Sequence, residues 1–473
     1  MENQNMIFSN KEDFKKKVFV SFLGLIFFSF SLAATKDAFA ETDRVEKTAE
    51  VEEKILSWGE FAGDIGLGVI GSNIYTTLQV GADIREGDVS AGIQAALRLK
   101  TVSFDHRRGS TVRKEDWDEP SDFAQMIRYL TYGKDLGFLS FGLNLGVLCP
   151  ANIGHGTLME NYNSLVDLNY PHSGFQARVR HKYFGIDFVM DDFVMPKILA
   201  MRLEARIKGF SFGWTGMMDI KAPRVALLDE EGNRRVSDTR KLMVQTDTLG
   251  FVGYDFSYTF GNKKGFWIKP YVDNNWAVGH GGGVHAGVKI SGKLFSSKLR
   301  LTGRAEYRLG WKGYAPEYVD LFYDIQRYQV PLGSSWRERR DGAVETKLTL
   351  LSFFPSVTHG AKWEVGIKYE KLFWMRGAYN LRQGPLGDMA FFEVGVPYGR
   401  RWVFSGLVAK TGLFDKDAFA SSDGLLAGGE ARVEFLRNFY VLGQFRYLYG
   451  LDDMGMYSGI VLANLAVGGR WGY

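Results

Sequence analysis

Alternation of apolar and polar residues with a period of two recurs along most of this chain. From Leu139 to Val147 the odd positions are Leu, Phe, Leu, Leu and Val, and the even positions are Ser, Gly, Asn and Gly. Successive side chains of a β-strand point to opposite faces. Each such stretch therefore predicts a strand with one apolar face and one polar face.

The alternation predicts about 16–18 strands. Short polar or glycine-rich turns such as 262–265 and 281–283 separate neighbouring runs, as in antiparallel hairpins. The clear runs lie at 78–84, 91–99, 139–147, 175–180, 186–190, 201–207, 210–220, 252–260, 284–290, 299–311, 344–350, 363–369, 392–396, 402–408, 431–435, 439–449 and 457–473, and weaker runs lie at 63–70, 126–132 and 266–276.

Two architectures bury one face of such a sheet: a soluble sandwich or propeller, and a membrane barrel. The runs 298–311 and 457–473 exceed the ~5–6 residues usual in soluble sheets. The polar faces carry charges of both signs, which a water-filled lumen solvates and a dry core does not. Aromatic residues gather near strand ends, where a membrane interface lies: Tyr307, Trp311, Phe373, Trp374, Tyr447, Tyr449, Trp471 and Tyr473. We therefore expect an all-β, closed antiparallel transmembrane β-barrel, with a soluble periplasmic β-protein as the alternative.

The first 40 residues have the layout of a secretory signal peptide. A basic stretch, 15–17, precedes the uncharged stretch 18–33, and Ala38-Phe39-Ala40 follows as a cleavage site. The alternative is a membrane-anchoring helix, for which the apolar run is short. We expect a signal peptide at 1–40, a short periplasmic segment at 41–60 and the barrel at 61–473.

Composition narrows the choice of function. Lys and Arg number 58 and Asp and Glu number 54, so bulk charge gives no reason to expect a nucleic acid partner. Cys149 is the only cysteine, which excludes an intramolecular disulfide framework. Aromatic residues make up 15% of the chain, a high share for a water-soluble domain.

The cleavable leader, the two-faced strands and the terminal stretch from Val467 to Tyr473 together resemble a Gram-negative outer-membrane β-barrel protein of the porin-like kind. The resemblance implies an outer-membrane location, contact with lipid and lipopolysaccharide, and no cofactor. It also implies that the last strand, with Trp471 and Tyr473, is the signal read by the barrel-assembly machinery. Phe is the commoner final residue in that class, so Tyr473 is a departure. Assembly into a homo-oligomer stays open.

Charged residues on the polar faces are the candidate pore lining: Arg178, Arg180, Arg202, Arg206, Arg300, Arg304, Arg308, Glu306, Glu364 and Glu370. Arginine ladders favour anions, so we expect a porin-like diffusion channel for small polar or anionic solutes. For any single residue the favoured interpretation is an ion pair across neighbouring strands that fills the interior. A barrel without a pore, with a structural or surface-binding role, is the first alternative function.

Long connections are expected at 105–123, 149–171, 221–241, 312–341, 375–388 and 412–427. The segment 312–341 mixes aromatic residues with arginines. It either folds inward as a constriction or presents a contact surface, or it is a solvated surface loop, which is the interpretation we favour.

An enzyme is the least favoured class, represented by a barrel lipase or protease. His155 lies between two glycines, which leaves its ring open to act as a general base, but no spacing fixes a partner for it. His280 and His285 flank a run of glycines with no further ligands for a metal, and the run reads as a hairpin turn.

Overall fold

The computed structural model describes residues 58–103, 111–237, 241–262, 265–294, 298–311, 313–330, 346–370, 372–398, 401–414, 416–452 and 454–472. The expected signal peptide at 1–40 and the segment before the barrel lie outside the described residues, except that the first strand already begins at Trp58.

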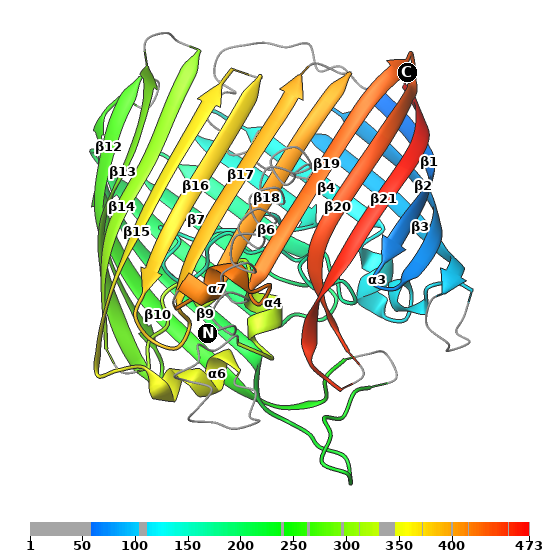
Figure 1. Cartoon of the computed structure of the whole chain (residues 1–473). Coiled ribbons are helices and arrows are strands. Elements are labelled where there is room, and N and C mark those ends of the chain that lie inside the picture. The colour runs from blue at the N-terminus through cyan, green and yellow to red at the C-terminus, as the bar shows by residue number, and fades with distance from the viewer. Residues whose placement is uncertain are drawn as a thin grey trace, which may run out of the picture.

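The chain forms one closed antiparallel β-barrel (Figure 1). Each strand pairs with the next along the chain, and the last strand pairs with the first through Ile65↔Val467 and its neighbours. The strands are β1 (Trp58–Ile70), β2 (Asn73–Glu86), β3 (Val89–Ser103), β4 (Ile127–Asp135), β5 (Leu139–Gly146), β6 (Gly174–His181), β7 (Phe184–Met190), β8 (Ile198–Ile207), β9 (Phe210–Ala226), β10 (Val244–Tyr258), β11 (Phe260–Gly261), β12 (Phe266–Ala277), β13 (Gly281–Leu294), β14 (Leu299–Trp311), β15 (Val357–Tyr369), β16 (Phe373–Arg382), β17 (Asp388–Tyr398), β18 (Trp402–Leu413), β19 (Leu425–Leu436), β20 (Phe439–Leu451) and β21 (Tyr457–Gly472). The helices are η1 (Lys114–Asp116), α3 (Pro120–Ala124), α4 (Tyr323–Gln326), α6 (Lys347–Leu350), η2 (Leu351–Phe353) and α7 (Lys416–Ala420).

The predicted fold class is confirmed, with more strands than the expected 16–18. β10 and β11 both pair with β12 and together take one position in the barrel. The 21 strands therefore fill 20 positions around the ring. The expected loop 375–388 was wrong, because residues 373–382 form β16. The expected strand 344–350 was wrong as well. Its described part begins helix α6, whose Thr346 hydroxyl accepts a hydrogen bond from the backbone N–H of Thr349.

The two ends of the barrel differ in their connections. At the end where β1 starts and β21 finishes, consecutive strands are joined by only two to four residues, apart from the single residue between β10 and β11. The opposite end carries the long connections, which are 104–126, 147–173, 227–243, 312–356 and 414–424. Figure 1 shows helices α4, α6 and α7 gathered at that end. Short turns face the periplasm and long loops the exterior in outer-membrane barrels, which fixes the orientation.

The outer face of the barrel is apolar. Residues of the apolar series predicted from the sequence point outward and stay exposed, for example Ile65, Leu67 and Leu465 at 57%, 60% and 63%. Among the described residues, no helix is long and apolar enough to cross a membrane. Because a closed ring pairs the backbone groups of every strand, it is suited to hydrocarbon. The chain is an outer-membrane β-barrel, and the expected location is confirmed.

Two of the long connections fold into the barrel. Residues 148–164 and 313–327 are buried almost throughout. Most of their apolar side chains cluster with the inner faces of β7–β10, and Leu321, Phe322 and Ile325 belong to a second cluster with β1, β2 and β17–β21. We call residues 147–173 and 313–330 together the insert. The favoured interpretation of 312–341 as a solvated loop was therefore wrong for its described part, and the inward-folding alternative is confirmed.

Candidate functional site

The two segments of the insert are joined to each other before they meet the wall. The backbone N–H of Glu160 donates to the carbonyl of Val319 at 2.9 Å, and the N–H of Glu317 donates to the carbonyl of Thr157 at 2.8 Å. Met159 and Val319 form a parallel bridge. Because each of these bonds crosses from one segment to the other, the insert behaves as one body.

Two carboxylates hold the insert against the strands β14–β16. Glu160 accepts two hydrogen bonds from Arg304 Nη1, at 2.8 and 2.9 Å, and also pairs with Lys362. Glu317 pairs with Arg308 Nη2 at 2.5 Å and with Lys362 Nζ at 2.7 Å. We call this set the clamp. Charge-assisted bonds of this kind are roughly twice as strong as neutral ones, and all five side chains are buried.

A second contact ties the insert to β9. Asp219 accepts hydrogen bonds from the hydroxyls of Tyr318 and Tyr323, at 3.1 and 2.5 Å, and lies 3.4 Å from Arg327 Nη2. Asp219 itself is fully buried. A buried carboxylate needs such partners because desolvation of an unpaired charge costs several kcal/mol. The clamp and this contact grip the insert from two directions.

The histidine singled out from the sequence is part of this packing. His155 is 3% exposed, its Nε2 lies 3.2 Å from Asp255 Oδ1, and its ring stacks on Tyr271 with centroids 4.2 Å apart. Burial lowers the pKa of His155 to about 3, so the ring is neutral at ordinary pH. Asp255 also forms a two-bond pair with Arg202. His155 thus serves to seat the insert on β8 and β10.

The predicted pore-lining residues fall into two groups by their exposure, and one residue, Glu370, belongs to neither group. Arg202, Arg304, Glu306 and Arg308 are inward-facing but lie under the insert, at most 7% exposed. Inward-facing residues with at least partial exposure are Arg178, Arg180, Arg206, Arg300 and Glu364. The exception is Glu370, which follows β15 in a periplasmic turn and pairs with Lys298 at 3.4 Å. Their role in permeation stays a prediction.

Many of these charges are paired, some across neighbouring strands, as with Arg180 and Asp187, and some within one strand, as with Arg206 and Glu204, so the expected pairing across strands stays a prediction for the set. Arg180 Nη2 lies 2.5 Å from Asp187, and Arg206 Nε donates to Glu204 at 2.8 Å. Of the two other histidines, His285 lies between Glu306 and Tyr314, at 3.0 and 2.7 Å, while His280 lies in the turn before β13. No group of three metal-ligating side chains occurs in the described part of the chain. Trp471 points outward and is 46% exposed, and Tyr473 lies outside the described residues.

The insert divides the inner surface of the barrel into two walls. On one side the inward polar residues are buried beneath it, and we call them the covered wall: Arg202, Thr215, Asp219, Asp255, Asp273, Asn275, His285, Glu306, Arg308, Lys362, Asn380 and Arg382, from β8–β10 and β12–β16. On the other side they stay partly exposed, and we call them the open wall: Asp64, Gln79, Gln94, Arg98, Asn144, Gln176, Arg178, Arg432, Gln444, Arg446 and Asn464, from β1–β3, β5, β6 and β19–β21.

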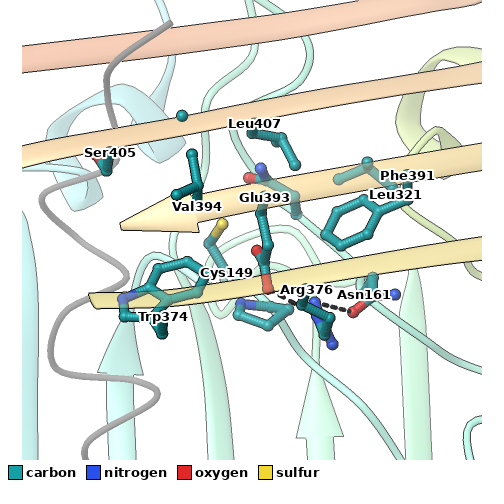
Figure 2. A pocket seen from close by; sticks show the side chains of 13 residues that line it. Cys149, Asn161, Leu321, Trp374, Arg376, Phe391, Glu393, Val394, Ser405 and Leu407 are labelled. Carbon is teal, nitrogen blue, oxygen red and sulfur yellow. Dashed lines mark hydrogen bonds and ion pairs between the residues drawn. The ribbon is translucent and has the colours of Figure 1, made fainter. Parts of the chain in front are cut away.

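Where the walls meet, the insert leaves a small pocket against β16–β18 (Figure 2). Trp374, Phe391 and Leu407 give it an apolar side, and Cys149 and Asn161 reach it from the insert. Figure 2 shows Arg376 between Glu393 and Asn161, which accept its hydrogen bonds at 2.7 and 2.9 Å.

Sequence reasoning missed the residues that create this division. Glu160 and Glu317 lie in connections, where no alternation indicates the direction of a side chain. Arg432 and Arg446 lie in runs that were predicted as strands. Each occupies a position of the polar series in its run, and that position could have indicated that its side chain faces the lumen.

The comparisons with known proteins give only distant likenesses, and the assignment of the barrel fold rests on the strand pairing of this chain. No protein-family model matches the chain, and no curated protein matches it. Solved structures with a similar outline include OccK5 (OpdH) of Pseudomonas aeruginosa, at 10% identity, covering 88% of this chain and 98% of that one with a TM-score of 0.34. OccAB2 of Acinetobacter baumannii is 10% identical, with 89% of this chain and 100% of that one covered and a TM-score of 0.30. OprD of Pseudomonas aeruginosa is 8% identical, with 88% of this chain and 95% of that one covered and a TM-score of 0.31. Likeness at this distance assigns neither a family nor a solute.

Proposed function

We propose that this outer-membrane barrel is a diffusion channel for small solutes with a preference for anions, and that solutes pass between the insert and the open wall. The observation that carries the proposal is the unequal exposure of the inward polar residues. Those of the open wall are partly exposed and come from eight strands, whereas those of the covered wall are buried. A wall of exposed polar side chains inside a lipid-facing barrel is what a water-filled passage requires.

The charge on the open wall supports the anion preference. Within the set that defines the open wall, arginines outnumber acids, with Arg98, Arg178, Arg432 and Arg446 against Asp64; the same strands also carry the inward acids Glu60, Asp83, Glu430 and Glu434. The Nε atoms of Arg432 and Arg446 are buried and have no hydrogen-bond partner among the described residues. The arginines that stay partly exposed on this wall carry positive charge, which lowers the barrier to the entry of anions.

The insert limits the size of the solute. Its clamp and its contact with Asp219 hold folded chain across a large part of the lumen. Backbone bonds from residues 166–168 to Tyr449 also tie the insert to β20, so the free surface is limited to the partly exposed residues of the open wall. Small solutes therefore fit the proposal better than oligomers or folded chains.

Ion selectivity in planar bilayers tests the proposal. Refolded protein under a salt gradient should give reproducible single-channel steps and a reversal potential that indicates anion preference. Replacing Arg432→Gln and Arg446→Gln should move the reversal potential toward zero and leave the barrel folded. Arg437→Gln is the matched control, because it removes the same charge in the exposed periplasmic turn 437–438.

A barrel without a pore is the second candidate, favoured by the same buried clamp that holds the insert in place. Folded protein that inserts into bilayers and gives no steps at any voltage would establish this candidate and overturn the channel. If the double variant still gives single-channel conductance steps and its ion selectivity is unchanged, the protein is a channel but the two arginines do not cause its anion preference.

A further inference from the structure

Three buried side chains of the insert meet around the hydroxyl of Tyr162. This oxygen lies 2.7 Å from His172 Nε2 and 2.9 Å from Asp324 Oδ2. The other ring nitrogen, His172 Nδ1, lies 3.0 Å from the carbonyl oxygen of Tyr170. Tyr162, His172 and Asp324 are at most 3% exposed. We call them the trio; the first two belong to the first segment of the insert, 147–173, and Asp324 belongs to the second, 313–330.

The three contacts of the trio need three hydrogens. A carbonyl oxygen only accepts, so His172 Nδ1 carries a hydrogen and donates it to Tyr170. A neutral histidine then has no hydrogen on Nε2, and the Tyr162 hydroxyl has one hydrogen for its two contacts. If Asp324 were ionised as well, one contact of Tyr162 would bring two lone pairs together with no hydrogen between them.

One additional proton completes the set. On His172 it gives an imidazolium, whose Nε2–H donates to Tyr162 while the Tyr162 hydroxyl donates to the Asp324 carboxylate. On Asp324 it gives a carboxylic acid, which donates to Tyr162 while the Tyr162 hydroxyl donates to His172 Nε2. In both arrangements the trio has no net charge. All three observed contacts are therefore satisfied only when this proton is present, whichever of the two residues carries it.

The surroundings of the trio also favour the additional proton. Asp324 Oδ1 is buried with no hydrogen-bond partner among the described residues, so an ionised Asp324 would make a single hydrogen bond, which burial makes costly. Among the groups that face the trio, three carboxylates stand against two cations, and one of these, Arg327, also lies 3.4 Å from Asp219. The facing groups are Asp191, Asp192 and Lys197 from the connection between β7 and β8, Asp167 and Tyr170 from the first segment, Tyr323, Arg327 and Tyr328 from the second, and Tyr457 from β21.

The trio joins the two segments of the insert beside the open wall. Asp324 lies in helix α4, and its contact with Tyr162 connects α4 to the first segment. Phe322, which directly precedes α4, and Ile325 within it pack in an apolar cluster with β1, β2 and β17–β21. Because β1, β2 and β19–β21 contribute to the open wall, the position of α4 decides how closely the insert approaches that wall.

We propose that the trio holds one additional proton at neutral pH, and that loss of this proton at alkaline pH loosens α4 from the first segment of the insert. The proton leaves to solvent, His172 is then neutral and Asp324 ionised, and one contact of Tyr162 is lost. We call this proton-dependent link the latch. The latch stands on the geometry of the trio. A change in the passage along the open wall is its further consequence, and that part alone rests on the proposed channel function.

Spectroscopy of the folded wild-type chain tests the additional proton directly. At neutral pH the expected result is either the nitrogen NMR signals of a doubly protonated His172 ring or the infrared band of a carboxylic acid at Asp324. Either signal should disappear in Asp324→Asn, because the amide N–H then donates to Tyr162 and a neutral His172 accepts from the Tyr162 hydroxyl. A neutral His172 ring together with an ionised Asp324 in the wild-type chain at neutral pH would overturn the proposal.

The pH dependence of unfolding tests the latch. Above about pH 6.5 an unfolded chain has neutral histidine and ionised aspartate, so the folded trio binds one proton more. The contribution of the latch is therefore lost as the pH rises. The unfolding equilibrium constant should increase by up to about tenfold per pH unit until the folded trio releases its proton. His155 is neutral in both the folded and the unfolded chain in this range and adds no slope. Denaturant titrations of the barrel in detergent provide the measurement.

Asp324→Asn and Asp167→Asn form a matched pair for these titrations. Each variant replaces a buried carboxylate that accepts a hydrogen bond from a tyrosine, and Asp167 accepts from the Tyr457 hydroxyl at 2.9 Å with no histidine in the contact. The tenfold slope should vanish in Asp324→Asn, because its three contacts need no additional proton, and it should persist in Asp167→Asn. A slope that survives in Asp324→Asn, or that is lost in both variants, would overturn the assignment to the trio.

Bilayer recordings over the same pH range test the consequence for the passage. The conductance of the wild-type chain should rise as the pH is raised above neutral, and that of Asp324→Asn should keep its neutral value. A conductance that follows pH equally in the two chains would overturn the coupling between the latch and the open wall. Silent bilayers for both chains, with the additional proton detected by spectroscopy, would reject the channel and keep the latch.

Discussion

The covered wall and the open wall belong to the same ring of strands, yet they differ in the exposure and the pairing of their inward side chains. On the covered wall, arginines and acids are buried and paired with each other or with the insert. On the open wall, arginines, amides and a carboxylate remain partly exposed. Both walls come from the same alternation of residues. The difference arises from the loops, which bury the polar residues of the covered wall and touch the open wall mainly through apolar residues such as Tyr449 and Tyr457.

This comparison separates two uses of a charged lumen. Under the insert, ion pairs are structural, because each buried charge depends on its partner. Along the open wall the charged side chains are partly exposed, so water can solvate them, even where they pair, as Arg98 does with Asp116 and Arg178 with Asp187. A charged residue that faces the lumen therefore does not indicate a role in permeation until it is known whether the insert buries it.

The largest effect is expected from loss of the clamp. Glu160→Gln with Glu317→Gln removes both carboxylates that pair with buried Lys362 and leaves Glu306 as the remaining counter-charge of Arg304 and Arg308, and each buried pair that is broken costs about 3–5 kcal/mol. The insert should detach, the unfolding temperature should fall, and the conductance should rise. Thermal unfolding in detergent and bilayer recordings measure these changes. Asp417→Asn on the exposed helix α7 is the control that should change neither.

The next effect concerns the two faces of one strand. Leu78 of β2 points outward and its neighbour Gln79 points into the lumen. Leu78→Arg places a charge in hydrocarbon and should destabilise the barrel by about 2–4 kcal/mol. Gln79→Arg should be nearly neutral, because water reaches the open wall. Equal destabilisation by the two variants in lipid vesicles would contradict the assignment of the faces.

A smaller effect distinguishes the walls by the room in front of them. A Cβ at Gly213 of β9 would lie 2.1 Å from Asp255 Oδ2 and 2.3 Å from Arg202 Nη2, whereas a Cβ at Gly142 of β5 meets nothing within 4 Å. Gly213→Ala should cost about 1–3 kcal/mol through overpacking, and Gly142→Ala should cost little. Denaturant unfolding of the two variants provides the measurement. Gly142→Trp should leave the fold intact and lower the conductance.

The smallest effect is expected from mild acid. Because the pKa of His155 is lowered to about 3 in the folded state, seating of the insert is fully supported above pH 6.5 and loses support as the pH falls toward 3. Between pH 7 and pH 6 the loss is about 1 kcal/mol or less. Conductance should become noisier on acidification, and His155→Gln, which keeps a hydrogen bond to Asp255, should flatten this dependence. An identical pH profile in the variant would remove His155 as the cause.

The barrel could be predicted because lipid on one side and water on the other impose a period of two on the sequence. The alternation located nearly all strands. It failed where a helix has an alternating sequence, and where a strand lacks the alternation. Around 344–350 the alternating residues include Thr346, whose side chain caps α6 instead of continuing a strand. In β16, Gly377 and Ala378 interrupt the contrast between the faces, so the strand read as a loop.

The division of the lumen could not be predicted in the same way. Whether Arg304 faces water or a carboxylate depends on Glu160, which is 144 residues away along the chain. Loop residues have no periodic signal, and their burial is decided by tertiary contacts such as the two tyrosines that reach Asp219. The expected charge pairing across strands was visible from the sequence, but the pairs with the insert were not.

Accessibility of introduced cysteines to a water-soluble thiol reagent tests the central claim most directly. The native Cys149 is a quiet background, because it is buried and burial raises the pKa of its thiol to about 12. Gln79→Cys and Asn144→Cys on the open wall should react rapidly in folded protein and, once modified, reduce the conductance. Thr215→Cys and Asn380→Cys on the covered wall should react only after unfolding. Equal reactivity of the two pairs in the folded barrel would contradict the division of the lumen, and with it the proposed path.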